Sequence, residues 1–252
     1  MNCIYCNTPI DGNNKSSEHV LPQWIINKSG IGKTPFSLKS VSRDLFEFDI
    51  TTPVPKTLTH KICKSCNNGW LHKIDDSCME LLSCFIDGTD PAQYLNLTNL
   101  ENLKTLLYKI FLNFFASGPK QFKQDKVEFY NLFYENGSSP EATNLFILNP
   151  PTDEIFALSA LDHWLPTSET YKFENEGFRF KFYLQLGKIA FILCNSGNNN
   201  TRILFDSNIL MPLSIHPSTL STNLGLNYPC HPSVEDNIIN RILVNSLLII
   251  EQ

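Results

Sequence analysis

The sequence has little charge of either sign and no long apolar run. Charged residues make up 18% of the 252 residues, against 42% that are hydrophobic, so the chain is too apolar to remain disordered. The longest apolar stretch, residues 242–250, contains Asn245 and Ser246 and is far shorter than the roughly 20 residues that a bilayer-spanning helix needs. The first six residues also lack the basic and apolar segments of a secretory signal. These absences predict a folded cytoplasmic protein with no membrane segment.

A broad basic surface is absent as well. The net charge is -5, and residues 1–80 contain nine lysines and arginines against eight acidic residues, so the acidity belongs to the rest of the chain. Contact with nucleic acid would therefore depend on a local group of basic side chains. We expect Lys56, Lys61 and Lys64 to follow a phosphate backbone, although the same three residues also suit an ordinary solvated surface.

Eight cysteines are present, and four of them form two identical pairs. Cys3-x-x-Cys6 and Cys63-x-x-Cys66 each place two thiols on one tight turn. Disulfides are rare in the cytosol because thiols are kept reduced there, so metal binding explains pairs with this spacing better. We therefore predict a structural zinc ion held by these four residues, which would close the 56-residue insertion between the pairs.

Helical and strand-like patterns alternate along the chain. Apolar side chains at helical spacing predict helices over residues 24–27, 68–88, 98–118 and 127–134. Strands are expected at residues 46–50, 145–148, 178–186, 189–194 and 202–205, with Gly187-Lys188 as a hairpin turn. Ser233 is expected to cap a final helix that continues to the C-terminus.

A cluster of turn-forming residues, Asp87-Gly88-Thr89-Asp90-Pro91, divides the chain. It predicts a small N-terminal domain over residues 1–88 and a larger mixed α+β domain over residues 89–252. The fold class expected for the whole chain is α+β.

A polar motif lies between the two cysteine pairs. Glu18-His19-Val20-Leu21-Pro22 occupies an extended segment, and Asn67 follows Cys66 where a helix is expected to begin. A zinc ion shared by the two pairs would bring these places together. The pattern C-x2-C, E-H-V-x-P, C-x2-C-N resembles the HNH endonucleases. It is most similar to the zinc-knuckle branch that ends in Asn, as in phage junction-resolving endonucleases, and it covers residues 3 to about 85.

This resemblance implies a ββα-metal fold that cradles one divalent cation and hydrolyses phosphodiester bonds in DNA. It implies that His19 is the general base that takes a proton from the attacking water. Glu18 and Asn67 would ligate the cation, Mg²⁺ or Mn²⁺, and the products would carry a 5′ phosphate and a 3′ hydroxyl. Glu18 stands where the commonest family form has Asp. Asn68 is an alternative to Asn67, and His72 would hold the phosphate, complete the metal shell or be a solvated surface histidine.

Two other classes of function compete with this interpretation. The first is a zinc-knuckle module that binds nucleic acid or protein without catalysis, with His19 as a strand histidine and Asn67 as a helix cap. The second is a hydrolase with its site in the C-terminal part, which is disfavoured because the chain lacks a G-x-S-x-G motif. By analogy with HNH effectors of antiphage and restriction systems, residues 89–252 would sense a signal, dock a partner or form a homo-oligomer. DNA is the expected nucleic acid, and RNA is the alternative.

Overall fold

The computed structural model describes 13 segments of the chain, namely residues 1–33, 36–41, 50–52, 58–118, 123–124, 126–150, 155–162, 164, 178–197, 202–217, 219–222, 238–243 and 248–251. They form two compact units. Unit 1 comprises Met1–Phe36 and Thr51–Pro140, and unit 2 comprises Ser37–Ile50 and Glu141–Gln252. Helices and strands both contribute substantially, which confirms the α+β class. Lys56 and residues 46–49 of the strand expected at residues 46–50 lie outside the described residues.

Unit 1 contains a two-stranded antiparallel ribbon. Strand β1 (Lys15–His19) pairs with β4 (Thr59–Cys63), with Glu18 opposite His60 and His19 opposite Thr59. Since side chains alternate between the faces of a strand, Glu18 and His60 share one face and His19 lies on the other. The first face is turned inward, because Glu18 and His60 are both buried while His19 is half-buried.

Short helices flank the ribbon. Helix α1 (Gln23–Ser29) and the 3-10 turn η1 (Ile31–Lys33) lie between its strands in the chain, and α1 ends at Gly30 with a φ of 71°. After β4 come α2 (Lys64–Cys66), the π-helical turn η3 (Asn67–Leu71), α3 (His72–Ser77) and α4 (Met79–Asp87). The single helix expected over residues 68–88 is thus broken. Gly69 departs from helical geometry (φ -99°, ψ -109°), and Cys78 separates α3 from α4.

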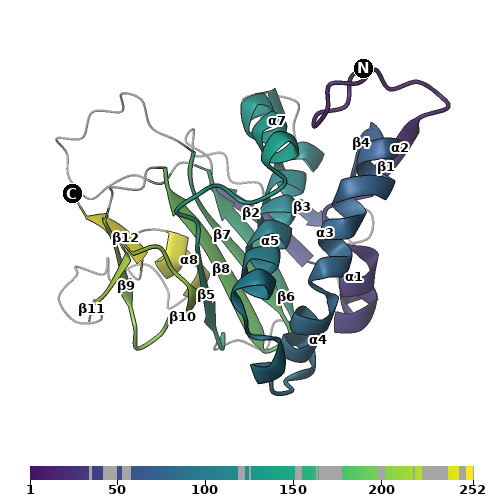
Figure 1. Cartoon of the computed structure of the whole chain (residues 1–252). Coiled ribbons are helices and arrows are strands. Elements are labelled where there is room, and N and C mark those ends of the chain that lie inside the picture. The colour runs from purple at the N-terminus through teal and green to yellow at the C-terminus, as the bar shows by residue number, and fades with distance from the viewer. Residues whose placement is uncertain are drawn as a thin grey trace. The chain divides into compact units, whose positions relative to one another are not determined.

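Unit 1 continues well beyond residue 88. The 3-10 turn η4 (Ala92–Tyr94) leads to the long helix α5 (Leu97–Ser117), which is buried from Leu103 to Ala116, and then to α7 (Val127–Asn136). Helix α5 packs beside α3 and against β4 (Figure 1). It is capped by Asn96, whose side chain accepts a hydrogen bond from the Asn99 amide, and not by Thr98. The compact unit therefore ends at Pro140, whereas the turn residues of the sequence predict a boundary at residue 88.

An aromatic cluster holds the N-terminal turn against these helices. The buried Tyr5 ring meets Trp70 edge-on with 5.3 Å between ring centroids, and Tyr130 at 5.6 Å. Phe133 of α7 contacts Trp70 at 5.1 Å and Tyr108 of α5 at 5.2 Å. Such edge-to-face pairs contribute beyond the area they bury. The turn that carries Cys3 and Cys6 is thereby fixed to α5 and α7.

Unit 2 contains most of a seven-stranded sheet with the order β10-β5-β8-β7-β6-β2-β3, in which Thr51 and Thr52 of β3 belong to unit 1. Its strands are β2 (Phe36–Val41), β3 (Ile50–Thr52), β5 (Asn144–Leu148), β6 (Phe156–Leu161), β7 (Arg179–Leu186), β8 (Ile189–Ser196) and β10 (Met211–Ser214). The pairs from β10 to β6 are antiparallel, and β2 joins β6 in parallel. Gly187 makes the β7–β8 turn with a φ of 65°, at the place expected for a hairpin.

A second, three-stranded sheet completes unit 2, with the order β11-β9-β12. It contains β11 (Thr219–Thr222), β9 (Arg202–Asp206) and β12 (Leu248–Glu251). Helix α8 spans only Ile238–Leu243, so the prediction of a helix running to the C-terminus is wrong. Leu248–Ile250 are apolar enough to suit either a helix or a strand, and Leu248–Glu251 pair antiparallel with β9. Among the helices described, none combines the length and the apolar character that crossing a bilayer requires.

Candidate metal centre and the Glu18–His19 pair

The four paired cysteines come together in unit 1. The Sγ atoms of Cys3, Cys6, Cys63 and Cys66 all lie within 4.8 Å of one another. Those of Cys6 and Cys63 are 3.6 Å apart. A tetrahedral zinc site with Zn–S bonds of about 2.3 Å requires S–S distances of about 3.8 Å. The four cysteines could therefore hold a zinc ion.

Local backbone structure explains why each pair turns toward the cluster. In the first pair, the Asn7 amide donates to the Cys3 carbonyl at 2.9 Å, and Asn7 adopts a φ of 56°. In the second pair, Cys63 is the N-cap of α2, and its Sγ accepts a hydrogen bond from the Cys66 amide at 3.4 Å. Both knuckles therefore present sulfur atoms at a turn, where neighbouring N–H groups stabilise thiolates.

The thiols interact strongly with one another. Hydrogen bonding with Cys66 lowers the pKa of Cys3 to about 4, and the same contact raises the pKa of Cys66. Without a cation, one member of such a pair ionises at the expense of the other. All four can be thiolates together only when a positive charge lies among them, as zinc would provide.

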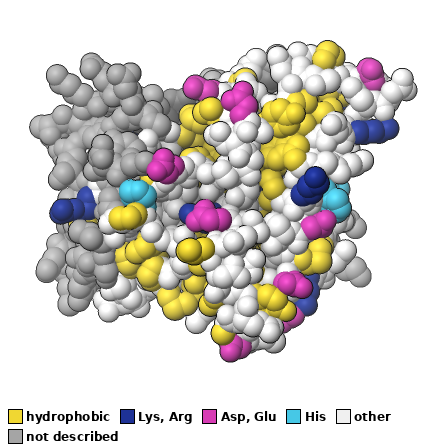
Figure 2. Space-filling model, in the orientation of Figure 1, with side chains coloured by type: hydrophobic (Ala, Val, Ile, Leu, Met, Phe, Trp, Pro, Cys, Tyr) yellow, Lys and Arg dark blue, Asp and Glu magenta, His cyan; other side chains and the backbone are white. Residues whose placement is uncertain are grey.

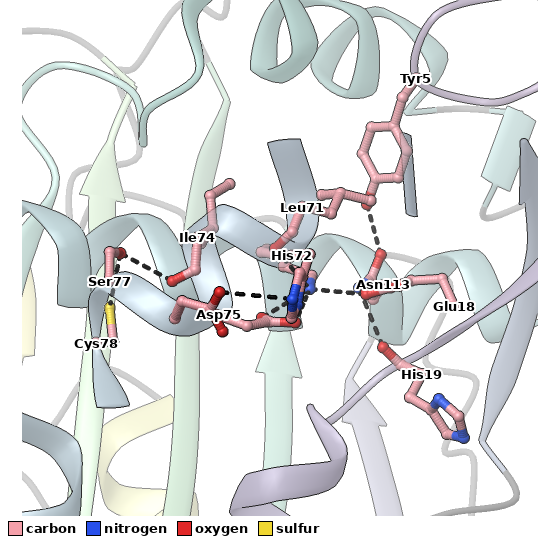
Figure 3. Close-up of polar contacts among 12 residues, drawn as sticks. Tyr5, Glu18, His19, Leu71, His72, Ile74, Asp75, Ser77, Cys78 and Asn113 are labelled. Carbon is pink, nitrogen blue, oxygen red and sulfur yellow. Dashed lines mark hydrogen bonds and ion pairs between the residues drawn. The ribbon is translucent and has the colours of Figure 1, made fainter. Parts of the chain in front are cut away.

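His19 ends strand β1 with its ring outside the buried network. Figure 3 shows the imidazole directed away from Asn113 and Glu18, although the His19 backbone takes part in that network. Burial lowers the pKa of His19 below its ordinary value, and the nearby Lys109 ammonium lowers it further. The ring is therefore neutral at pH 7 and can accept a proton.

Glu18, only 5% exposed, is paired with a lysine that the sequence analysis does not identify. Its Oε1 lies 2.8 Å from the Nζ of Lys109, which is fully buried on α5. The same Nζ lies 2.7 and 2.8 Å from the two carboxylate oxygens of Asp75 on α3. One buried ammonium thus serves two carboxylates, and burial raises the pKa of Asp75 to about 6.

Asn113, one helical turn after Lys109, is the centre of this network (Figure 3). Its Oδ1 accepts hydrogen bonds from the Tyr5 hydroxyl and from His60 Nε2, the latter at 2.8 Å. Its Nδ2 donates to Glu18 Oε1 and to the His19 carbonyl, both at 3.3 Å. Burial lowers the pKa of His60 to about 3, so His60 is neutral and donates from Nε2.

Asn67 connects the start of the helical segment to the ribbon. Its Nδ2 donates to Ser16 Oγ at 2.6 Å and to the Ser17 carbonyl at 3.1 Å. The side chain therefore joins Asn67 to β1, two residues from Glu18. It does not cap the helix, since Cys63 occupies the N-cap of α2.

The polar contacts of Glu18 and Asn67, the two predicted cation ligands, leave one oxygen atom available on each side chain. Both contacts of the Glu18 carboxylate fall on Oε1, and both contacts of the Asn67 amide come from its nitrogen. Within the described part of the chain, Glu18 Oε2 and Asn67 Oδ1 make no hydrogen bond. A carboxylate oxygen and an amide oxygen are donors that suit Mg²⁺ or Mn²⁺, so the donor chemistry fits.

The other predicted site residues lie at the surface. Asn68 is exposed, and His72 is exposed with its Nε2 3.5 Å from an Asp76 carboxylate oxygen. Lys64 is exposed, while Lys61 is half-buried and donates to Ser17 Oγ on the ribbon face that carries His19. Figure 2 shows scattered rather than clustered basic side chains on the face drawn.

Four residues of the network were missed from the sequence, namely Tyr5, Asp75, Lys109 and Asn113. A signal for two of them was present. Lys109 and Asn113 stand four residues apart in the otherwise apolar segment Leu106–Phe115, and polar groups in such a position need buried partners. Nothing in the sequence identifies those partners, because they lie 34 to 108 residues away.

Comparisons with protein-family models, with curated proteins and with solved structures give no match. The assignment of this chain to a class of protein therefore depends on the four-cysteine cluster, on the motif residues and on the geometry around them.

Proposed function

We propose that the protein is a metal-dependent HNH-type endonuclease that hydrolyses phosphodiester bonds in DNA. One observation carries the proposal, namely that the β1–β4 ribbon and the start of the following helical segment connect three motif residues. His19 and Glu18 end β1, and Asn67 hydrogen-bonds to the same strand beside the four-cysteine cluster. The order strand, strand, helix is that of the ββα-metal fold.

In this proposal His19 is the general base. Its neutral ring, on the outer face of the ribbon, takes a proton from the water that attacks the phosphodiester. Glu18 and Asn67 would hold a divalent cation through Oε2 and Oδ1, and such a cation would neutralise the phosphate and the leaving 3′ oxygen. Lys61 lies on the same ribbon face as His19 and provides a positive charge for the nucleic-acid backbone. The four cysteines hold structural zinc.

We also propose a role for unit 2 and a cellular compartment for the reaction. Unit 2 would sense a signal, bind a partner protein or join two copies of the chain, as in nuclease effectors of antiphage or restriction systems. The reduced cytoplasm would keep the four thiols available for zinc.

The experiment is cleavage of supercoiled plasmid by the purified protein with Mg²⁺, Mn²⁺ or EDTA. The His19→Ala variant should lose cleavage and keep its zinc. His216→Ala, a histidine of unit 2, should retain both. Equal cleavage by His19→Ala and the wild type would refute the role of His19. Loss of cleavage in His72→Ala would give that residue the phosphate role, whereas full activity would make it a solvated surface histidine.

One observation favours a second candidate, a zinc-knuckle module that binds nucleic acid or protein without catalysis. The Glu18 carboxylate already has a buried partner in Lys109, which gives it a structural function that needs no cation. This candidate predicts no cleavage of DNA or RNA with any metal. It also predicts that binding survives when His19 and Asn67 are both replaced by Ala.

A further inference from the structure

Helix α5 carries two polar residues at its most buried part. Lys109 and Asn113 are both 0% exposed, and they lie on one side of the helix because they are four residues apart. Burying an amide or an ammonium is costly unless every polar atom finds a partner. Lys109 does so by contacting β1 and α3, and Asn113 does so by contacting β1, His60 of β4 and Tyr5, all of which belong to the motif region.

The Asn113 amide uses its full hydrogen-bonding capacity. An amide has two N–H donors and an oxygen with two lone pairs, and the four contacts of Asn113 occupy all of them. Turning the amide by 180° would place its oxygen against the Glu18 carboxylate and the His19 carbonyl, where the contacts would be repulsive. The orientation of the side chain is therefore fixed.

The hydrogen bond from Asn113 to the His19 carbonyl satisfies a carbonyl group that the ribbon itself leaves unpaired. The Val20 amide donates to the Leu58 carbonyl at 3.0 Å, so Val20 and Leu58 form a hydrogen-bonded pair. In an antiparallel ladder these pairs alternate, which makes His19 and Thr59 a non-hydrogen-bonded pair. The His19 carbonyl consequently points away from β4, and Asn113 supplies the hydrogen bond that the ladder does not.

We propose that Asn113 is a positioning residue for the general base. It fixes the His19–Val20 peptide through the carbonyl and fixes the preceding residue through the Glu18 carboxylate. With both contacts in place, the Cα–Cβ bond of His19 has one direction relative to Asn67 and the cysteine cluster. This inference deepens the proposed nuclease function, on which it rests, by adding a helix that lies outside the HNH-like motif.

The test compares three variants, each loaded with zinc. Asn113→Asp keeps the acceptor for Tyr5 and His60 but loses both donors, and Asn113→Leu loses all four bonds. The matched control is Asn102→Leu, on the same helix, half-buried and with no polar contact shown among the described residues. Three quantities are measured: amide hydrogen exchange of residues 15–24, the single-turnover rate of plasmid cleavage, and DNA affinity.

Both Asn113 variants should accelerate exchange in residues 15–20 while α3 keeps its protection. Cleavage should slow by about 10²-fold, the cost of displacing a catalytic group by about 1 Å, with DNA affinity unchanged. The control should match the wild type in all three measurements. Unchanged exchange and cleavage in Asn113→Asp would overturn the inference. An equal loss of α3 protection, DNA affinity and cleavage would also overturn it, because a general structural role would explain that result.

If neither Asn113 variant folds, Asn113→Ser decides, since this smaller polar side chain gives up both bonds to β1: faster exchange in residues 15–20 supports the inference and unchanged exchange contradicts it. If the wild type cleaves no substrate, the proposed function fails. Hydrogen exchange then still shows whether Asn113 fixes the ribbon.

Discussion

Replacing Lys109 by Met tests the buried charge network directly. The substitution preserves most of the side-chain volume of Lys109 but removes the ammonium that lies within 2.8 Å of both Glu18 and Asp75. Two buried carboxylates would then lack their common partner. Removing one member of a buried ion pair costs about 3 to 5 kcal/mol, a large part of the roughly 5 to 15 kcal/mol that stabilises a domain.

The pH dependence gives this prediction a distinct signature. Burial raises the pKa of Asp75 from 3.8 to about 6, so the folded protein binds this proton more tightly than the unfolded chain does. The free energy of unfolding therefore falls as the pH rises through that interval. Without Lys109 the pKa of Asp75 should rise further. The deficit of Lys109→Met relative to the wild type should thus be smaller at pH 4.5 than at pH 7.

The assay is urea unfolding followed by tryptophan fluorescence. The chain has three tryptophans, and a Trp164→Phe background leaves Trp24 and Trp70, both in unit 1. Lys28→Met is the matched control, because Lys28 pairs with Asp87 at 2.5 Å on the surface, where such pairs contribute about 0 to 1 kcal/mol. A loss below 1 kcal/mol in Lys109→Met at pH 7 would show that the buried network does not form in solution.

Three further predictions concern the metal, the base and the nucleic acid. Cys66→Ala should lose zinc and the folded state of unit 1, whereas Cys84→Ala, a half-buried cysteine outside the cluster, should keep one zinc ion per chain by elemental analysis. Because the pKa of His19 lies below 6.5, single-turnover cleavage should rise with pH through a midpoint below 6.5, and a midpoint above 7 would contradict His19 as the base. Lys61→Ala should weaken DNA binding and reduce the slope of log K against log salt by about one, measured by fluorescence anisotropy.

The structure could be predicted from the sequence where a local pattern determines it. The C-x-x-C spacing predicted the cysteine cluster, and two strand-like segments joined by Gly187-Lys188 predicted the β7–β8 hairpin. The structure could not be predicted where tertiary contacts determine whether a segment forms a helix or a strand. The segment Leu248–Ile250 suits a helix or a strand, and only pairing with β9 selects the strand.

The candidate site shows the same limit. Glu18, His19 and Asn67 were found from their order in the chain, but the partner of Glu18 was not, because Lys109 is 91 residues away on a helix assigned to another domain. The boundary expected at residue 88 followed from turn residues that end α4 at Gly88. A turn ends a helix without ending a domain, and here the chain returns to pack α5 against α3.

The path of the chain between the two cysteine pairs has a thermodynamic consequence. Within the segment from residue 7 to residue 62, Ser37–Ile50 belong to unit 2, where β2 pairs with β6. A zinc ion bound by both pairs closes this segment into a loop, and the entropy lost on closure grows with the length that remains unstructured. If zinc binds both pairs, its affinity and the docking of β2 would be linked, and each would change the other by the same factor. Leu38→Pro, which disrupts β2, should weaken zinc binding by about threefold, because doubling the length of a flexible loop has roughly this effect on the entropy of closure. Unit 2 would then affect the metal centre through the connecting chain alone.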